Sequence, residues 1–165
     1  MVKIGINGFG RIGRLVLRAL LENYKDKIQV VAINDLGSIE ANAHLVKYDS
    51  THGTLPFDVE TSKDGFKILN QNIKVFAERD PVNLPWDKVG VDIVLECTGL
   101  FLDKISAEKH IKAGAKKVII SAPAKEVDFT VVQGVNSSDL KKEHNVISNG
   151  SCTTNCLAPV AMVLE

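Results

Sequence analysis

The stretch Val2–Gly13, VKIGINGFGRIG, decides how this chain begins to fold. Val2–Ile6 is an apolar run that predicts a buried strand starting at the first residues. A helical pattern follows, because apolar residues recur at the spacing of one helix face: Ile12, Leu15, Val16, Ala19 and Leu20. Three glycines separate the two patterns. The stretch therefore predicts a strand, a tight glycine turn and the N-terminus of a helix.

Gly8, Gly10 and Gly13 form the pattern G-x-G-x-x-G at this turn. The first glycine permits the turn, the second lets a pyrophosphate approach the backbone, and the third lets helix and strand pack closely. A second strand pattern, Gln29–Ile33, ends in Asp35, about 20 residues after the last glycine, where a carboxylate binds ribose hydroxyls. These features predict a dinucleotide site; a nucleotide site without redox chemistry, such as a methyl-donor site, is the alternative.

The rest of the chain predicts an α/β fold of the Rossmann type, with a doubly wound, mostly parallel sheet and an antiparallel hairpin insertion. A helix is expected over Ile39–Tyr48, with three residues facing inward: Ala43, Leu45 and Val46. Two short runs on either side of a Lys63-Asp64-Gly65 turn predict the hairpin: Phe57–Thr61 and Gly65–Leu69. A further strand is expected at Ile73–Phe76 as part of the same antiparallel insertion, and no chemistry is assigned to this part. The only tryptophan, Trp86, is expected in a loop.

Small or polar residues stand at the ends of several predicted strands. Besides the glycine turn and Asp35, the strand Val91–Cys97 runs into Thr98-Gly99, and the strand Lys117–Ile120 runs into Ser121. In an open α/β sheet, ligands bind at the carboxyl ends of the strands. The residues are therefore expected to converge on one crevice, although Thr98 and Ser121 are as well suited to capping or turning the chain.

A second informative stretch, SNGSCTTNC, covers Ser148–Cys156. It predicts a strand end, a turn at Asn149-Gly150 and a helix N-terminus near Cys152. Unpaired N–H groups and the positive end of the helix dipole favour a thiolate at such a position, so Cys152 is a candidate nucleophile. The alternative is that Ser151 or Thr153 only caps the helix and Cys152 is a small buried residue.

Composition narrows the classes of function. The chain has 165 residues, with 20 basic and 20 acidic side chains, so no net field draws it to nucleic acid or to an anionic membrane. No apolar run approaches the roughly 20 residues of a membrane span, and the first residues do not resemble a signal peptide. The three cysteines form no C-x-x-C pair and no zinc-like spacing. We expect free thiols, no metal site and a cytoplasmic location.

Both motif segments, Lys3–Arg14 and Ser148–Cys156, resemble the signature segments of the glyceraldehyde-3-phosphate dehydrogenase family. Other segments are similar as well: Val31–Asp35, Leu45–Ser50, Glu96–Gly99 and Ile120–Ala124. The resemblance implies contacts with NAD from the glycine turn and from Arg11, Ile12, Asp35, Arg79 and Ser121, with Thr98 and Gly99 close by. It implies a nucleophile at Cys152, with Ser151 and Thr153 lining the substrate or phosphate pocket. Gly150 departs from the family, which often has alanine there.

The same resemblance implies oxidation of glyceraldehyde 3-phosphate, with phosphate and NAD, to 1,3-bisphosphoglycerate in glycolysis, by a homotetramer. A sibling such as erythrose-4-phosphate dehydrogenase, and a non-catalytic NAD-binding module, are the alternatives. Family members continue beyond residue 165 into a catalytic domain that carries a histidine base, whereas all four histidines here precede Cys152. We therefore expect a cofactor domain over residues 1–150, the first helix of a truncated catalytic domain over residues 151–165, and no turnover by this segment alone.

Overall fold

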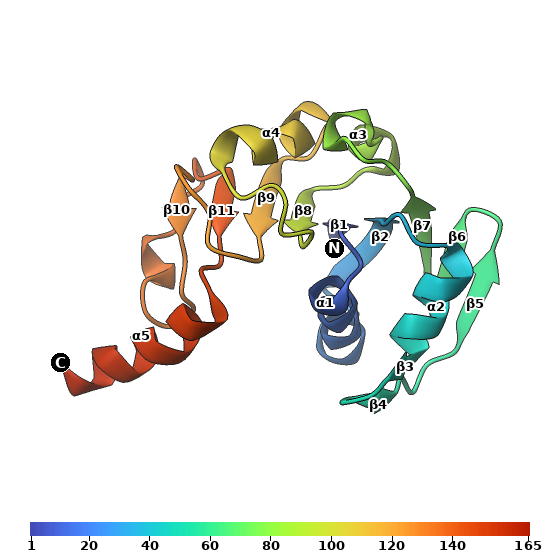
Figure 1. Cartoon of the computed structure of the whole chain (residues 1–165), viewed down its shortest axis with the longest axis horizontal. Helices are drawn as coiled ribbons and strands as arrows, with labels where there is room; N and C mark the ends of the chain where they lie inside the picture. The colour runs from blue at the N-terminus through green and yellow to red at the C-terminus, as the bar shows by residue number, and fades with distance from the viewer.

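A computed structural model describes residues 1–165, which form one large sheet with helices around it (Figure 1). The strands of this sheet are β1 Val2–Asn7, β2 Ile28–Asn34, β5 Val59–Ser62, β6 Gly65–Ile68, β7 Gln71–Phe76, β8 Ile93–Glu96, β9 Lys117–Ile120, β10 Phe129–Thr130 and β11 Val146–Ser148. The α-helices are α1 Arg11–Asn23, α2 Ile39–Lys47, α3 Trp86–Val89, α4 Lys104–Lys112 and α5 Cys152–Leu164. Short 3-10 helices cover Pro81–Asn83 and Ser137–Asp139, and a small antiparallel pair joins β3 Tyr48–Asp49 to β4 Gly53–Thr54.

The nine strands follow the order β10-β11-β9-β8-β1-β2-β7-β6-β5. Neighbours from β10 to β7 are parallel, and β5, β6 and β7 pair antiparallel as the inserted hairpin. The predicted fold class, an α/β sheet that is mostly parallel with an antiparallel hairpin, is confirmed. The chain leaves β1 towards β2 on one side and later returns to β8 on the other, so the order reverses at β1. A crevice for a ligand is expected at such a reversal.

Alternate residues of the central strands face opposite sides of the sheet. Ile4 and Ile6 of β1 belong to a cluster of 13 buried residues that also includes Leu17 and Leu21 of α1. Gly5, between them, faces the other way, because a Cβ there would lie 3.0 Å from the Trp86 ring. Figure 1 shows α1 and α2 on one side and α3 and α4 on the other. Both faces are thus covered, as a doubly wound sheet requires.

Three expectations about individual elements were wrong. Leu45 does not face inward but is 42% exposed, because the buried face of α2 runs through Ala43 and Val46, three residues apart. Trp86 is not in a loop but begins α3 and is fully buried. The strand expected at Ile73–Phe76 does not belong to the antiparallel insertion alone: as β7 it pairs antiparallel with β6 but in parallel with β2, and so extends the main sheet.

Helix α5 projects from the end of the sheet that carries β10 and β11 (Figure 1). None of its residues is buried, and its apolar side chains are largely exposed: Leu157 is 67% exposed and Val163 is 80% exposed. None of the helices combines the length and the apolar character that crossing a membrane requires.

Asp128 stabilises the end of the sheet that carries β10 and β11. Its Oδ2 accepts hydrogen bonds from the N–H groups of Asn145 (2.8 Å) and Val146 (2.9 Å), and its Oδ1 accepts one from Lys104 Nζ (2.7 Å). Burial pushes the pKa of Asp128 upward, but the hydrogen bonds from Lys104, Val146 and Asn145 outweigh it and lower the pKa to about 2.

We predict that Asp128→Asn lowers the free energy of unfolding by about 1–2 kcal/mol at pH 7, because the amide cannot accept all three bonds. The folded-state pKa is depressed, so the contribution is complete above the unfolded-state value of about 3.9 and disappears as the pH falls towards 2. Urea denaturation of both chains at pH 7 and pH 3 measures this. Asp26→Asn is the control, because Asp26 is exposed and its carboxylate forms no ion pair. An equal loss at both pH values would contradict the assignment.

Candidate functional site

A pocket of about 410 Å³ opens at the carboxyl edge of the sheet, at the reversal between β1 and β8. Its lining comes from the segments that follow four parallel strands. These residues are Asn7, Gly8 and Gly10 at the end of β1 and after it, Asn34, Asp35 and Leu36 at the end of β2 and after it, Glu78 and Arg79 after β7, and Cys97, Thr98, Leu100 and Phe101 after β8. The predicted convergence of strand ends therefore holds for the glycine turn, Asp35 and Thr98.

The three glycines of the turn have different steric surroundings. Gly8 has φ +89°, and a Cβ there would lie 2.7 Å from the backbone nitrogen of Thr98. A Cβ on Gly13 would collide with the carbonyl oxygen of Gly8. Gly10 has no atom within 4 Å of its Cβ position, and it is the N-cap of α1 with no side chain bonded to the first N–H groups. The turn thus leaves open space and free donors at a helix N-terminus, the usual setting for a phosphate.

Asp35 closes the glycine turn from the side of β2. Its Oδ2 accepts a hydrogen bond from the N–H of Phe9 at 2.9 Å, and its Oδ1 accepts one from the N–H of Gly37 at 2.8 Å. The side chain is half-buried and lines the pocket. Each carboxylate oxygen retains lone-pair capacity, so Asp35 is held in place and still available to ribose hydroxyls.

The other residues predicted to contact a dinucleotide divide into two groups. Arg79 and Thr98 line the pocket. Arg11 instead directs its guanidinium to Asp49 Oδ2 (3.1 Å) and Thr51 Oγ1 (3.1 Å). The pKa of Asp49 is held well below its usual range by hydrogen bonds from the N–H groups of His52 and Thr51. Ile12 is 50% exposed, Gly13 is buried within α1, and Gly99 follows Thr98 with φ +73°, all outside the lining.

Cys152 lies at the same edge of the sheet but outside this pocket, because β9 stands between β11 and β8. It is the first residue of α5 and is exposed. Ser151 is the N-cap: its Oγ accepts a hydrogen bond from the N–H of Thr154 at 2.9 Å and lies 2.8 Å from Thr153 Oγ1. The capping role of Ser151 is therefore real, whereas the alternative that Cys152 is a buried residue is wrong.

The turn before Cys152 is tied to the sheet. Ser148 is buried, its Oγ donates to the carbonyl of Ala122 at 2.8 Å, and it accepts from the N–H of Gly150 at 3.0 Å. Asn155 reaches back from α5 and donates to the carbonyl of Asn149 at 2.7 Å. These bonds fix the first turn of α5 relative to the end of β11.

Asn7, Asn34 and Glu78 were not singled out from the sequence. Asn34 Nδ2 donates to Asn7 Oδ1 (2.7 Å) and to the carbonyl of Glu78 (2.8 Å), while Asn34 Oδ1 accepts from the N–H of Glu78 (2.8 Å). These bonds join the ends of β1, β2 and β7 behind the pocket. The sequence feature that could have indicated this network is an asparagine at the end of each of two successive apolar strands. These residues, Asn7 and Asn34, are almost wholly buried.

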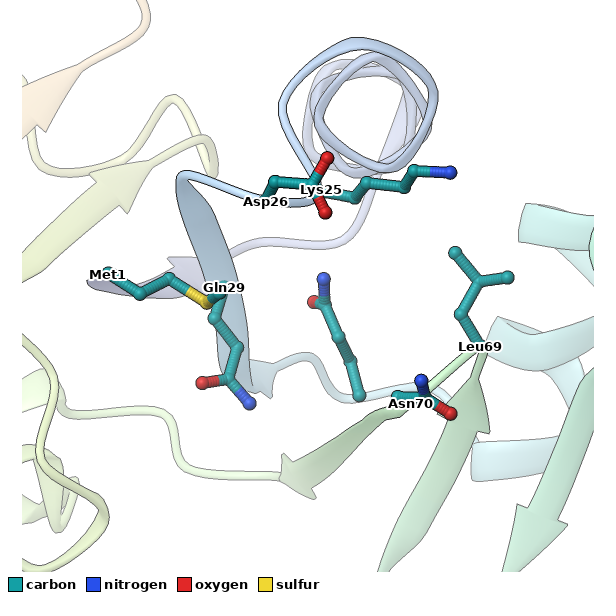
Figure 2. Close-up of a pocket in the computed structure, with 7 residues that line it drawn as sticks. Met1, Lys25, Asp26, Gln29, Leu69 and Asn70 are labelled. Carbon is teal, nitrogen blue, oxygen red and sulfur yellow. The ribbon is translucent and has the colours of Figure 1, made fainter.

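A second pocket, of about 480 Å³, lies at the opposite, amino edge of the sheet (Figure 2). It is lined by Met1, Lys25, Asp26, Gln29, Leu69, Asn70 and Gln71. Gln71 is buried and its Oε1 accepts from the N–H of Val30 at 3.2 Å, so its role is to join β7 to β2. None of the predicted site residues lies here.

Cys97, which lines the pocket at the end of β8, is unlike Cys152. Burial raises the pKa of Cys97 to about 11; a hydrogen bond with Ser121 opposes the rise and the negative charge of Glu96 adds to it. Ser121 therefore lies behind Cys97, outside the pocket lining, with its N–H donating to the carbonyl of Glu96 at 3.0 Å. A thiol in this state is a poor nucleophile at neutral pH.

Comparison with known proteins gives consistent results. Residues 2–104 match the family model described as "Glyceraldehyde 3-phosphate dehydrogenase, NAD binding domain". The chain is 56% identical to the glyceraldehyde-3-phosphate dehydrogenase of Pseudomonas aeruginosa over an alignment of 165 positions, which covers 99% of this chain and 49% of that protein. It is 58% identical to the enzyme of the same name from Zymomonas mobilis, with the same two coverages. The chain thus spans about half the length of the curated relatives it matches.

We predict that alkylation by iodoacetamide at pH 7.5 labels Cys152 fastest and Cys97 at least about 100-fold more slowly than Cys152, because so little of Cys97 is thiolate. Timed labelling followed by peptide mass mapping measures the three rates, with Cys156 as the exposed internal comparison. Labelling of Cys97 within tenfold of Cys152 would show that its environment is more polar than the structure indicates.

Proposed function

Because this chain belongs to the glyceraldehyde-3-phosphate dehydrogenase family, we propose that it supplies the NAD-binding part and the nucleophile of an enzyme that oxidises glyceraldehyde 3-phosphate. Residues 1–150 form the cofactor domain, and residues 151–165 are the first helix of the catalytic domain. The observation that best supports this proposal concerns one edge of the sheet. That edge holds both an open glycine turn at a helix N-terminus and an exposed cysteine at the start of another helix.

The pocket fits a dinucleotide on the chemistry of its own atoms. The free N–H groups at the start of α1 and the open space at Gly10 accommodate a pyrophosphate, and Asp35 accommodates the ribose hydroxyls on the adenine side. Arg79 and Thr98 form the neighbouring walls, and Gly99 directly follows Thr98. Ser121 supports Cys97 behind them, and Arg11 and Ile12 extend the turn. When bound, NAD supplies the hydride acceptor of the reaction.

Cys152 carries the covalent chemistry. Its thiolate attacks the aldehyde carbon to give a thiohemiacetal, and loss of hydride and of the hydroxyl proton leaves a thioester on the sulfur. Attack by inorganic phosphate releases 1,3-bisphosphoglycerate and restores the thiolate. The N–H groups at the start of α5 are placed to stabilise negative charge on the oxygen of these intermediates. Ser151 and Thr153 flank the sulfur and supply hydroxyls to the substrate or phosphate pocket.

The histidines of this chain are all engaged away from Cys152. His44 packs on Tyr48 with ring centroids 4.9 Å apart, and His52 Nδ1 lies 3.2 Å from Asp49 Oδ1. His110 is fully buried, and His144 stacks on Phe129 at 5.1 Å. The general base of the proposed reaction is therefore expected outside residues 1–165. The whole enzyme is expected to be a cytoplasmic homotetramer.

A chimera tests this function: residues 1–165 joined to the part of the Pseudomonas relative that they do not match. We expect NADH formation from glyceraldehyde 3-phosphate and phosphate, and its loss in Cys152→Ser. Residues 1–165 alone should bind NAD but turn over at least about 10²-fold more slowly, the cost of a missing general base. Faster oxidation of erythrose 4-phosphate by the chimera would indicate the sibling enzyme. Binding of NAD without any turnover would indicate a binding module.

We predict that Gly10→Ala weakens NAD binding by roughly tenfold or more, the loss expected when a methyl group displaces a phosphate from its backbone donors. The fold should tolerate the change, with a loss of about 1 kcal/mol or less, because no atom lies near the added Cβ. Titration calorimetry and urea denaturation give the two quantities. Gly13→Ala is the contrasting variant, since its Cβ would strike Gly8 and should destabilise the fold itself. Unchanged NAD affinity in Gly10→Ala would place the pyrophosphate elsewhere.

We also predict a preference for NAD over NADP that depends on Asp35. A carboxylate at the ribose opposes the 2′-phosphate of NADP through repulsion at close range. Asp35→Asn retains an oxygen acceptor but removes the charge, so the affinity ratio should shift towards NADP by about tenfold. Competitive titration of both chains with both cofactors measures the ratio, and no shift would rule out this role of Asp35.

A further inference from the structure

Two buried titratable side chains have no part in the chemistry proposed above. Glu96, at the end of β8, is 1% exposed, and His110, in α4, is 0% exposed. His110 Nε2 lies 2.9 Å from Glu96 Oε2, and its Nδ1 lies 3.0 Å from Trp86 Nε1. Hydrogen bonds thus join Trp86 to His110 and His110 to Glu96, which in turn contacts residues that line the dinucleotide pocket.

The hydrogen-bond chemistry assigns the protons of these three side chains. The indole N–H of Trp86 can only donate, so His110 Nδ1 must be an acceptor without a proton. A neutral imidazole then carries its proton on Nε2 and donates it to Glu96. A proton on Glu96 Oε2 would require both ring nitrogens to accept, which a neutral imidazole cannot do. His110 is therefore neutral, and Oε2 of Glu96 is an acceptor.

The other side of Glu96 is also surrounded by donors. Oε1 accepts from the N–H of Thr98 at 2.8 Å and from the Thr98 hydroxyl, which itself accepts from the N–H of Leu100 at 3.1 Å. Asn7 Nδ2 donates to Oε2 at 2.6 Å. The carboxyl group of Glu96 thus accepts hydrogen bonds from four donors and has no lysine or arginine partner. A buried carboxyl group of this kind depends on every one of its hydrogen bonds.

Two of the residues that donate to Glu96 are also walls of the pocket. Asn7 and Thr98 both line it, and Gly8 packs against Thr98 so closely that no Cβ fits between them. Asn7 also connects this network to β2, because its Oδ1 accepts a hydrogen bond from Asn34 at the end of that strand. One carboxylate therefore holds the ends of β1 and β8 directly and the end of β2 through Asn7.

We propose that Glu96, kept in its accepting state by His110 and Trp86, is a positioning residue for the dinucleotide site. It fixes the β1 turn against the β8 turn so that the glycine backbone and Thr98 face the ligand in one geometry. The proposal rests on the proposed function, since the site positioned is the NAD site. Glu96 itself touches no ligand and acts through Asn7 and Thr98.

The first test compares Glu96→Gln with Asp128→Asn. Both replace a carboxylate that accepts at least three hydrogen bonds by an amide of the same shape, but Asp128 lies at the far end of the sheet. Both should lower the free energy of unfolding. Only Glu96→Gln should also weaken NAD binding, by tenfold or more, because its NH₂ group must face a donor; Asp128→Asn should remain within twofold of the unchanged chain. Titration calorimetry on folded chains gives the affinities.

The second test determines directly which ring nitrogen of His110 carries the proton. In ¹⁵N NMR at neutral pH, His110 should appear as a neutral imidazole with the proton on Nε2, with or without NAD. Trp86→Phe keeps an aromatic ring but removes the donor, so His110 should lose this single tautomer and NAD affinity should fall threefold or more. If Glu96→Gln does not fold, the NAD affinity of Trp86→Phe tests the proposal in its place.

An imidazolium, or a proton on Nδ1, would overturn the proposal. So would NAD affinity within twofold of the unchanged chain in folded Glu96→Gln, or, where that variant does not fold, in Trp86→Phe. Absence of NAD binding by the unchanged chain would overturn the proposed function and this proposal with it, whereas normal binding with an unaffected Glu96→Gln variant overturns this proposal alone.

Discussion

The contact between Gly8 and Thr98 is the constraint on which the site depends. The two residues follow β1 and β8, the neighbouring strands at which the strand order reverses, and the backbones approach too closely for any Cβ at Gly8. A side chain there would push the two strand ends apart. The pocket would then lose its shape, because its walls on both sides are built from the segments that follow these strands. The tight turn, the open helix N-terminus and the position of Thr98 are therefore consequences of one close approach.

Much of this arrangement could be predicted from the sequence, because its signals are local. The glycine spacing, the change from strand to helix periodicity across the glycine turn and the acid at position 35 each reflect a nearby backbone requirement. The place of β7 in the parallel sheet was missed, since a short alternating strand looks the same whether its neighbour is parallel or antiparallel. Leu45 was misplaced for a related reason: nine residues of helix leave the direction of the buried face uncertain by one position.

The polar network could not be predicted, because its members are far apart in the chain. Asn7 and Glu96 stand at the ends of apolar runs, whereas His110 lies in the polar stretch Glu108–Lys112, and nothing in the local sequence shows that the three side chains meet. Arg18 is a similar case: it is 5% exposed and donates to the carbonyl groups of Val46, His52 and Gly53 rather than to a carboxylate. The chain thus buries Arg18 and Glu96 separately, each bonded to neutral groups. Such partners become visible only when the strands are assembled.

Helix α5 has a different balance of forces. Its first turn is bonded to the end of β11 through Ser148 and Asn155, but no residue of its length is buried against the sheet. A helix of 13 residues without tertiary packing is close to its helix–coil midpoint in water. When residues 1–165 are studied alone, amide protons along α5 should therefore exchange with solvent progressively faster from Cys156 towards Leu164, while the turn before Cys152 remains protected. The sulfur of Cys152 sits at the boundary between these two regimes, so its position is set by the sheet rather than by the helix that follows it.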